Sequence, residues 1–214
     1  VGRGYQDALF DAFNVARAEK REIFAECLAT MRSAWSGASV GNGANVSLWP
    51  RPVQSPHPPI WVAAFGPKAL QQAGILGLPY LASPMESLQT LARNYARHAA
   101  ACRDAQLAVP EIVPIMRTVF VSTDPALLDR VRSALAEQLI SMRAGATEAM
   151  RTRMPDAVDE WGIVGTPEHV RACIERYRAE LGMSHLIVTR LRIGGIDEGA
   201  LEQSVRTLAE LNSN

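Results

Sequence analysis

The chain has 214 residues, of which 48% are apolar and 21% charged, so it is long enough for one large α/β domain and shows no composition typical of disorder. Its 22 basic and 22 acidic residues leave no net charge, which argues against nucleic acid or an anionic membrane surface as a partner. No apolar run approaches the roughly 18 residues of a membrane span, and no signal-peptide pattern is present. We therefore expect the partner to be a small molecule or another protein.

The three cysteines, Cys27, Cys102 and Cys173, are far apart and lie in helical patterns. None belongs to a CxxC pair, and we see no local histidine that would suggest a zinc site. We expect reduced thiols buried in the core, as is usual in a cytoplasmic protein, and no metal site.

The first strong helical pattern covers residues 17–35 and ends near Gly37. Apolar side chains recur there at the spacing of an amphipathic helix, at Ile23, Phe24, Cys27, Leu28, Met31 and Trp35. Residues 36–59 are rich in Gly, Ser, Asn and Pro, which predicts a long irregular connection.

Strand and helix patterns alternate from residue 60 onward. Short apolar runs predict strands at 60–64, 78–83, 111–123 and 184–191. Helices are expected between and after these strands, at 66–77, 85–105, 125–142, 165–182 and from about Asp197. Thr166 is expected to cap the fourth of these helices and Gly182 to end it, while the stretch before Thr166 has no regular pattern.

This alternation predicts parallel strands joined by right-handed crossovers, hence a doubly wound sheet or a (β/α)₈ barrel. The short, continuously apolar strands fit both architectures, because both bury the sheet on two faces. A complete barrel needs eight strands, whereas the sequence shows four secure ones, so an open four-stranded sheet is the alternative.

Three segments together resemble the bacterial luciferase-like flavin monooxygenase family. They are VGRGYQDALFDAF at residues 1–13, PPIWVAAFGPKALQQAGILGLPYLAS at 58–83 and VGTPEHVRACIERYRAELGMSHLIV at 164–188. The resemblance implies a (β/α)₈ TIM barrel in which this chain covers the end of strand 4 and strands 5–8. Residues 1–214 would then be the C-terminal part of a single barrel domain whose N-terminal strands are absent.

The resemblance also implies a cofactor site, for FMN or alternatively for the deazaflavin F420. Arg3, in its glycine turn, matches the family's phosphate-binding arginine, and Tyr5 lies beside it; the competing interpretation is a solvated loop arginine. Gly66, Lys68 and Ala69 begin the helix after strand 5, where free N–H groups and the helix dipole favour an anion. Relatives often carry a glutamate and hydroxyl residues here, whereas this chain has AAFGPKA, which leaves backbone N–H groups and Lys68 as the candidates.

Ser83, at the end of strand 6, matches a family position near the flavin ring, but it is equally suited to cap the next helix. Met85 is a candidate contact for the ring or the substrate. Arg117 is the one charge within an apolar strand and requires a polar cavity or a partner, and Arg190 and Arg192 share one face of the last strand. We name Met85, Arg117 and Arg190 as candidate substrate contacts.

The function implied by the resemblance is oxidation of a small organic or apolar substrate with reduced flavin, and with O₂ where the flavin is FMN. We name no catalytic residue, because the family's residues at the reactive edge of the ring come mostly from strands 1–3. The alternative is a non-catalytic flavin-binding or structural half-barrel. We further expect the chain to pair with a copy of itself or with an N-terminal segment, because strands taken from a closed barrel leave open edges.

Overall fold

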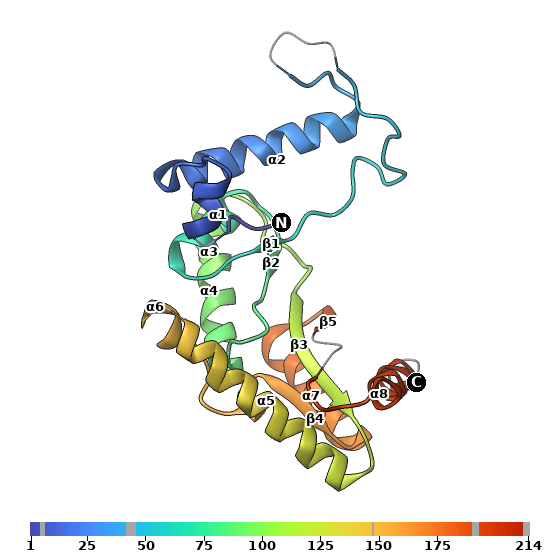
Figure 1. The fold of residues 1–214 in the computed structure, drawn as a ribbon. Helices are drawn as coiled ribbons and strands as arrows, with labels where there is room; N and C mark the ends of the chain where they lie inside the picture. The colour runs from blue at the N-terminus through green and yellow to red at the C-terminus, as the bar shows by residue number, and fades with distance from the viewer. Residues whose placement is uncertain (5–6, 42–45, 147, 190–192, 212–214) are drawn as a thin grey trace. The chain divides into compact units, whose positions relative to one another are not determined.

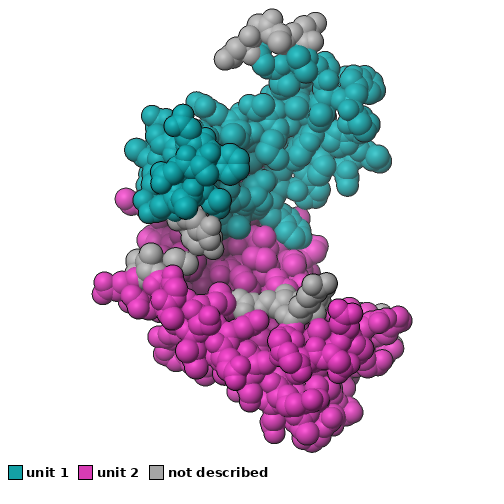
Figure 2. All heavy atoms as spheres, viewed as in Figure 1, with its two compact units in different colours: residues 1–64 teal, residues 65–214 magenta. Residues whose placement is uncertain are grey.

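The computed structural model describes the chain except for residues 5–6, 42–45, 147, 190–192 and 212–214. It divides into two compact units, unit 1 at Val1–Ala64 and unit 2 at Phe65–Asn214, which are described separately (Figure 2). Among the described residues, no helix is both long enough and apolar enough to cross a membrane.

Unit 1 is built around one long amphipathic helix. It contains α1 (Asp7–Ala12), the 3₁₀ turn η1 (Arg17–Glu19), α2 (Lys20–Ser36) and the short strand β1 (Val62–Ala63). The helix predicted at residues 17–35 is confirmed, and it ends as predicted at Gly37, whose φ of 87° turns the chain so that the Ala38 N–H group donates to the Ser33 carbonyl at 3.0 Å.

The N-terminal residues of unit 1 lie beside β1. Gly2 forms a parallel bridge with Ala63, and the Ala63 N–H group donates to the Val1 carbonyl at 2.8 Å. The first residues of the chain therefore run alongside β1 as a parallel strand end would.

Unit 2 alternates helices and strands, as predicted (Figure 1). Its elements are α3 (Pro67–Ile75), β2 (Tyr80–Leu81), α4 (Leu88–Asp104), β3 (Pro114–Val121), α5 (Pro125–Gly145), α6 (Glu148–Arg151), η2 (Val158–Glu160), β4 (Gly162–Gly165), α7 (Pro167–Leu181), β5 (His185–Thr189) and α8 (Glu198–Leu211). Thr166 caps α7 and Gly182 ends it, both as predicted. Strand β4 lies in the stretch for which the sequence predicts no regular element.

The centre of the sheet in unit 2 is β3. It pairs in parallel with β4 through Thr118–Val121 and with β5 through Pro114–Thr118. Ile115 faces Leu186 of β5 along one edge of β3 and bridges Ala82, directly after β2, along the other. The end of β2, β3 and β5 are thus parallel neighbours, and β4 pairs with the last residues of β3 on the edge opposite β5.

The two faces of β3 carry different side chains, because side chains alternate along a strand. Phe120 joins the main apolar cluster, which α5 covers from one side (Figure 1) and which comprises Met85, Phe120, Leu128, Val131, Leu135, Leu139, Val158, Trp161, Val164 and Ile193. Met116 and Thr118 share the face of Phe120, and Arg117 lies on the opposite face together with Ile115.

Candidate functional site

The predicted anion site lies at the start of α3, and its role in binding stays a prediction. Gly66 precedes the helix with φ 89° and ψ 167°, and its carbonyl accepts from the N–H groups of Ala69 and Leu70, both at 3.1 Å. Lys68, exposed in the first turn, has an N–H group with no partner within the helix, and the first turn contains no acidic residue. A negative group at this helix start would therefore meet the free Lys68 N–H group and the helix dipole, and no carboxylate from the first turn.

A residue that the sequence analysis did not single out lies at the same helix end. The Arg153 guanidinium sits over the Phe65 ring, 5.3 Å from its centroid, and against Gly66 at the place where any side chain would have its Cβ atom. Within the described part of the chain, no acidic side chain lies within ion-pairing distance of Arg153. Glycine is therefore suited to position 66 for two reasons: it adopts a positive φ, and its lack of a side chain leaves space for a guanidinium next to the helix start.

Two further predicted cofactor residues, Arg3 and Tyr5, belong to the sequence of unit 1. Arg3 is half-buried; burial, followed by the positive charge of Arg21, lowers its pKa from the ordinary value. Tyr5 lies outside the described residues, as does Arg190 of the predicted substrate contacts. Their roles in binding stay predictions.

Ser83, Met85 and Arg117, three predicted site residues, come together in unit 2. The Ser83 hydroxyl accepts from the Met85 N–H group at 3.3 Å, and the Ser83 carbonyl accepts from Arg117 Nη1 at 3.0 Å. Met85 is buried in the main apolar cluster. The helix cap that Ser83 was suited to provide comes instead from Ser87, whose hydroxyl accepts from the Thr90 N–H group.

Arg117 is completely buried, and protein groups occupy each of its nitrogens. Nε donates to the Tyr177 hydroxyl at 2.8 Å, Nη2 to the Glu86 carbonyl at 2.9 Å, and Nη1 to the Met116 carbonyl at 2.8 Å as well as to Ser83. The guanidinium also lies over the Tyr177 ring, 4.9 Å from its centroid. Of the two alternatives for Arg117, a cavity or a partner, the geometry provides the partners; a contact with substrate stays a prediction.

A buried carboxyl group lies close to Arg117. Glu86 is 1% exposed and accepts from the Tyr80 hydroxyl and from Asn94 Nδ2, both at 2.9 Å. Burial raises the pKa of Glu86, while these two hydrogen bonds and the charge of Arg117 act in the opposite direction. This network ties β2 and the start of α4 to β3 on the face opposite Thr118.

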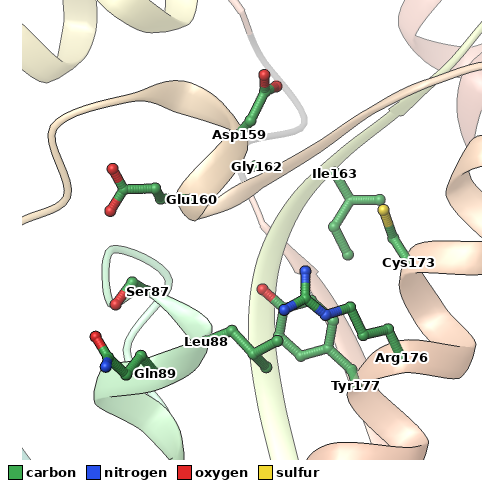
Figure 3. Close-up of a pocket in the computed structure, with 10 residues that line it drawn as sticks. All are labelled: Ser87, Leu88, Gln89, Asp159, Glu160, Gly162, Ile163, Cys173, Arg176 and Tyr177. Atoms are coloured by element: carbon green, nitrogen blue, oxygen red, sulfur yellow. The ribbon is translucent and has the colours of Figure 1, made fainter.

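A cavity of about 330 Å³ lies on the side of β3 where Tyr177 is (Figure 3). It is lined by Ser87, Leu88, Gln89, Asp159, Glu160, Gly162, Ile163, Cys173, Arg176 and Tyr177. Carboxylates and a guanidinium line the same space, and Arg176 Nε already pairs with Glu180 at 2.6 Å. Of the predicted site residues that the structure describes, none lines this cavity.

The expectation for the cysteines is correct only in part. Cys102 is buried, but Cys27 is exposed and Cys173 is half-buried. Both His98–Cys102 and His169–Cys173 are close pairs one helical turn apart, at 3.9 and 3.5 Å, so the statement that no histidine lies near a cysteine is wrong. Burial raises the pKa of both thiols, and within the described ranges no three His, Cys, Asp or Glu side chains gather as metal ligands would.

Comparison with known proteins gives a consistent result. Residues 1–185 match the family described as luciferase-like monooxygenase. An uncharacterised protein from Sinorhizobium fredii is 26% identical over 203 residues, an alignment that covers 89% of this chain and 56% of that protein. The chain thus spans little more than half the length of this relative.

Three solved structures share the fold. The monooxygenase RslO1 from Streptomyces bottropensis has a TM-score of 0.71 at 24% identity, over 98% of this chain and 65% of that one. The FMN complex of the oxygenating constituent of 3,6-diketocamphane monooxygenase, from the CAM plasmid of Pseudomonas putida, has a TM-score of 0.70 at 16% identity, over 98% and 69%. The coenzyme F420-dependent tetrahydromethanopterin reductase from Methanopyrus kandleri has a TM-score of 0.64 at 15% identity, over 94% and 70%. At these identities the likeness shows the fold alone.

Proposed function

Because the chain belongs to the luciferase-like monooxygenase family, we propose that it forms the C-terminal part of a flavin-binding (β/α)₈ barrel that oxidises a small organic substrate. Two features of the sheet support the barrel assignment. The end of β2 and β5 flank β3 on its two edges and run parallel to it, as neighbouring barrel strands do, and the short strand β4 pairs with the last residues of β3. Residues Val1 and Gly2 run parallel to β1, which is the arrangement that the end of strand 4 beside strand 5 would have.

The observation that carries the flavin assignment is the cationic start of α3. Both FMN and F420 carry phosphate, and a phosphate group is held by free backbone N–H groups at a helix start together with guanidinium groups. In this proposal the Lys68 N–H group and the Arg153 guanidinium bind the phosphate, with the Lys68 ammonium, Gly66 and Ala69 beside them.

The reduced cofactor supplies the electrons for the reaction, with O₂ as the second reactant where the cofactor is FMN. The described residues contribute binding and exclusion of water. Met85 and Phe120 provide a buried apolar surface at the carboxyl ends of the strands, where ligands of parallel α/β folds bind. Ser83, two residues after the end of β2, provides a hydroxyl beside the Met85 N–H group.

The phosphate site can be tested with two flavins that differ only in the phosphate. We expect Arg153→Ala to weaken binding of oxidised FMN, followed by fluorescence titration, by about 1–3 kcal/mol, the range for a lost charge-assisted hydrogen bond. Riboflavin, which lacks the phosphate, should bind the variant and the parent chain equally. Arg151→Ala, which removes an exposed arginine two residues away, is the matched control and should leave both affinities unchanged.

Two results would contradict this assignment. An unchanged FMN affinity would remove Arg153 from the site. An equal loss for FMN and riboflavin would show that Arg153 acts on the ring or on the fold rather than on the phosphate.

A further inference from the structure

Two buried hydroxyl groups lie side by side at the centre of the sheet. Thr118 of β3 and Thr189 of β5 are register partners, so their side chains project from the same face of two parallel strands. The Oγ1 atoms of both are shielded from solvent and have no hydrogen-bond partner among the residues that the structure describes. Thr118 is completely buried.

An unpaired buried hydroxyl is costly, because the group gives up its bonds to water without replacement. Valine has nearly the same shape without that cost, and it already occupies three other positions in these two strands. A pair of such hydroxyls on neighbouring strands therefore indicates that something outside the described residues completes their hydrogen bonds.

The surroundings of the pair define the chemistry of that partner. Along β3, the same face carries Met116 and Phe120, and Gly162 lies opposite Thr118 on the other edge, where it adds no side chain. The charge of Arg117 lies on the opposite face and is already bonded. Two hydroxyls, each able to donate and to accept, in an apolar setting fit a neutral group with carbonyl and N–H functions in one plane.

We propose that Thr118 and Thr189 hydrogen-bond the planar imide edge of the flavin or deazaflavin ring. This proposal rests on the proposed function and names residues for the ring end of the same cofactor. Thr189 is the last residue of β5, and Ser83 follows the end of β2 by two residues. Thr118 lies beside Thr189 within β3, three residues before that strand ends at Val121. Ligands of parallel sheets bind at the carboxyl ends of the strands.

The test uses Thr118→Val, Thr189→Val and the double variant, each titrated with riboflavin and with FMN. Each valine substitution should lower the affinity for riboflavin and for FMN by the same factor, about three- to tenfold, which corresponds to the loss of one neutral hydrogen bond. Without ligand, each valine should raise the melting temperature, because an unpaired buried hydroxyl is replaced by a methyl group. The serine variants at both positions keep the hydroxyl and should keep most of the affinity, and Thr123→Val, at an exposed threonine, should change neither quantity.

The possible failures can be told apart. Unchanged affinity for both flavins with a higher melting temperature would leave the hydroxyls without a ligand and overturn the proposal. Unchanged affinity with a lower melting temperature would assign the hydroxyls to an ordered water and also overturn it. If Arg153→Ala weakens FMN and neither valine does, the proposed function stands and only this inference fails; if the parent chain binds no flavin, both fail. If Thr118→Val does not fold, Thr189→Val and the serine variants provide the same comparison. Thr189 is only partly buried, so its substitution disturbs the fold less.

Discussion

Arg117 explains why a full charge is tolerated inside an apolar strand. A buried guanidinium is stable only where hydrogen bonds replace its hydration, and here two backbone carbonyls of other segments and the Tyr177 hydroxyl do so. The partners come from residues 34, 31 and 60 positions away in the sequence. Through these hydrogen bonds, Arg117 connects β3 to helix α7 and to the segment that follows β2.

The raised pKa of Glu86 predicts how the stability of the fold depends on pH. Its pKa is raised above the ordinary 4.5, with burial as the largest cause, so folding favours the protonated form. The stability that Glu86 contributes is therefore present below about pH 4.5 and is lost as the pH rises through its raised pKa. Urea unfolding of the parent chain and of Glu86→Gln should show the parent losing stability relative to the variant over this window, by at most about 1.4 kcal/mol per pH unit for one proton.

The control for this comparison is Glu137→Gln, which removes an exposed carboxylate from α5 outside the network. A parent chain that gains stability relative to Glu86→Gln as the pH rises would mean that the hydrogen bonds from Tyr80 and Asn94, together with the charge of Arg117, outweigh burial.

At the level of single residues, the sequence indicates which positions are unusual, but it does not reveal which residues contact them in the fold. Arg117 stands out because it is a charge among apolar residues, and this predicts that it needs a partner. Arg153 has no such signal, because it follows other polar residues in RTRMP, and its proximity to Gly66 depends on the path of the chain after α6. The unpaired state of Thr118 and Thr189 depends on strand register, which residue type alone does not reveal.

In unit 2, helices α3 and α4 are in close contact at a glycine, Gly74. Gly74 lies inside α3, although glycine lowers helix stability, and a Cβ atom there would come within 2.6 Å of the Ala101 Cβ atom and 2.8 Å of the His98 carbonyl. The absence of a side chain lets the backbones of the two helices approach each other.

Two glycines in helices therefore predict opposite effects of the same substitution. Gly74→Ala should destabilise the chain by about 1–3 kcal/mol, because the methyl group overpacks the contact with α4. Gly145→Ala, at the end of α5 with no atom within 4 Å of the added Cβ, should stabilise it by about 0.5–1 kcal/mol through helix propensity. Thermal or urea unfolding measures both, and a Gly74→Ala variant as stable as the parent would show that α3 and α4 can move apart at little cost.

The elements with clear start and stop residues were the predictable ones. Helix α7 has Thr166, Pro167 and Gly182 at its ends, and the structure confirms its predicted bounds to within two residues. Strand β4 was missed because only Ile163 and Val164 are apolar between two glycines, and so short a run gives no periodic signal. Its pairing with Val119 and Phe120 is a tertiary effect.

On the scale of the whole molecule, the alternation of strands and helices was sufficient to predict a parallel sheet, whereas the barrel came only from the resemblance. Alternation fixes parallel crossovers, but it leaves open whether the strands close on themselves. The division into two units was not predicted. It reflects how much each part buries: among the large apolar side chains of unit 1, Phe13 is 77%, Trp49 73% and Val53 99% exposed.

The difference in burial predicts that unit 1 opens more readily than unit 2. Helices α2 and α4 make a matched pair, because each has 17 residues, yet α2 buries only Phe24 and Leu28, whereas α4 buries Leu91, His98, Ala101 and Cys102. Local opening costs less where fewer apolar contacts break, so amide hydrogens of α2 should exchange at least about tenfold faster than those of α4, a difference of about 1.4 kcal/mol in opening free energy. Hydrogen exchange read by mass spectrometry on the intact chain measures both helices in one experiment, with the buried strand β3 as the most protected reference. Equal protection of α2 and α4 would contradict the prediction, because it would mean that the two units open together as one cooperative structure.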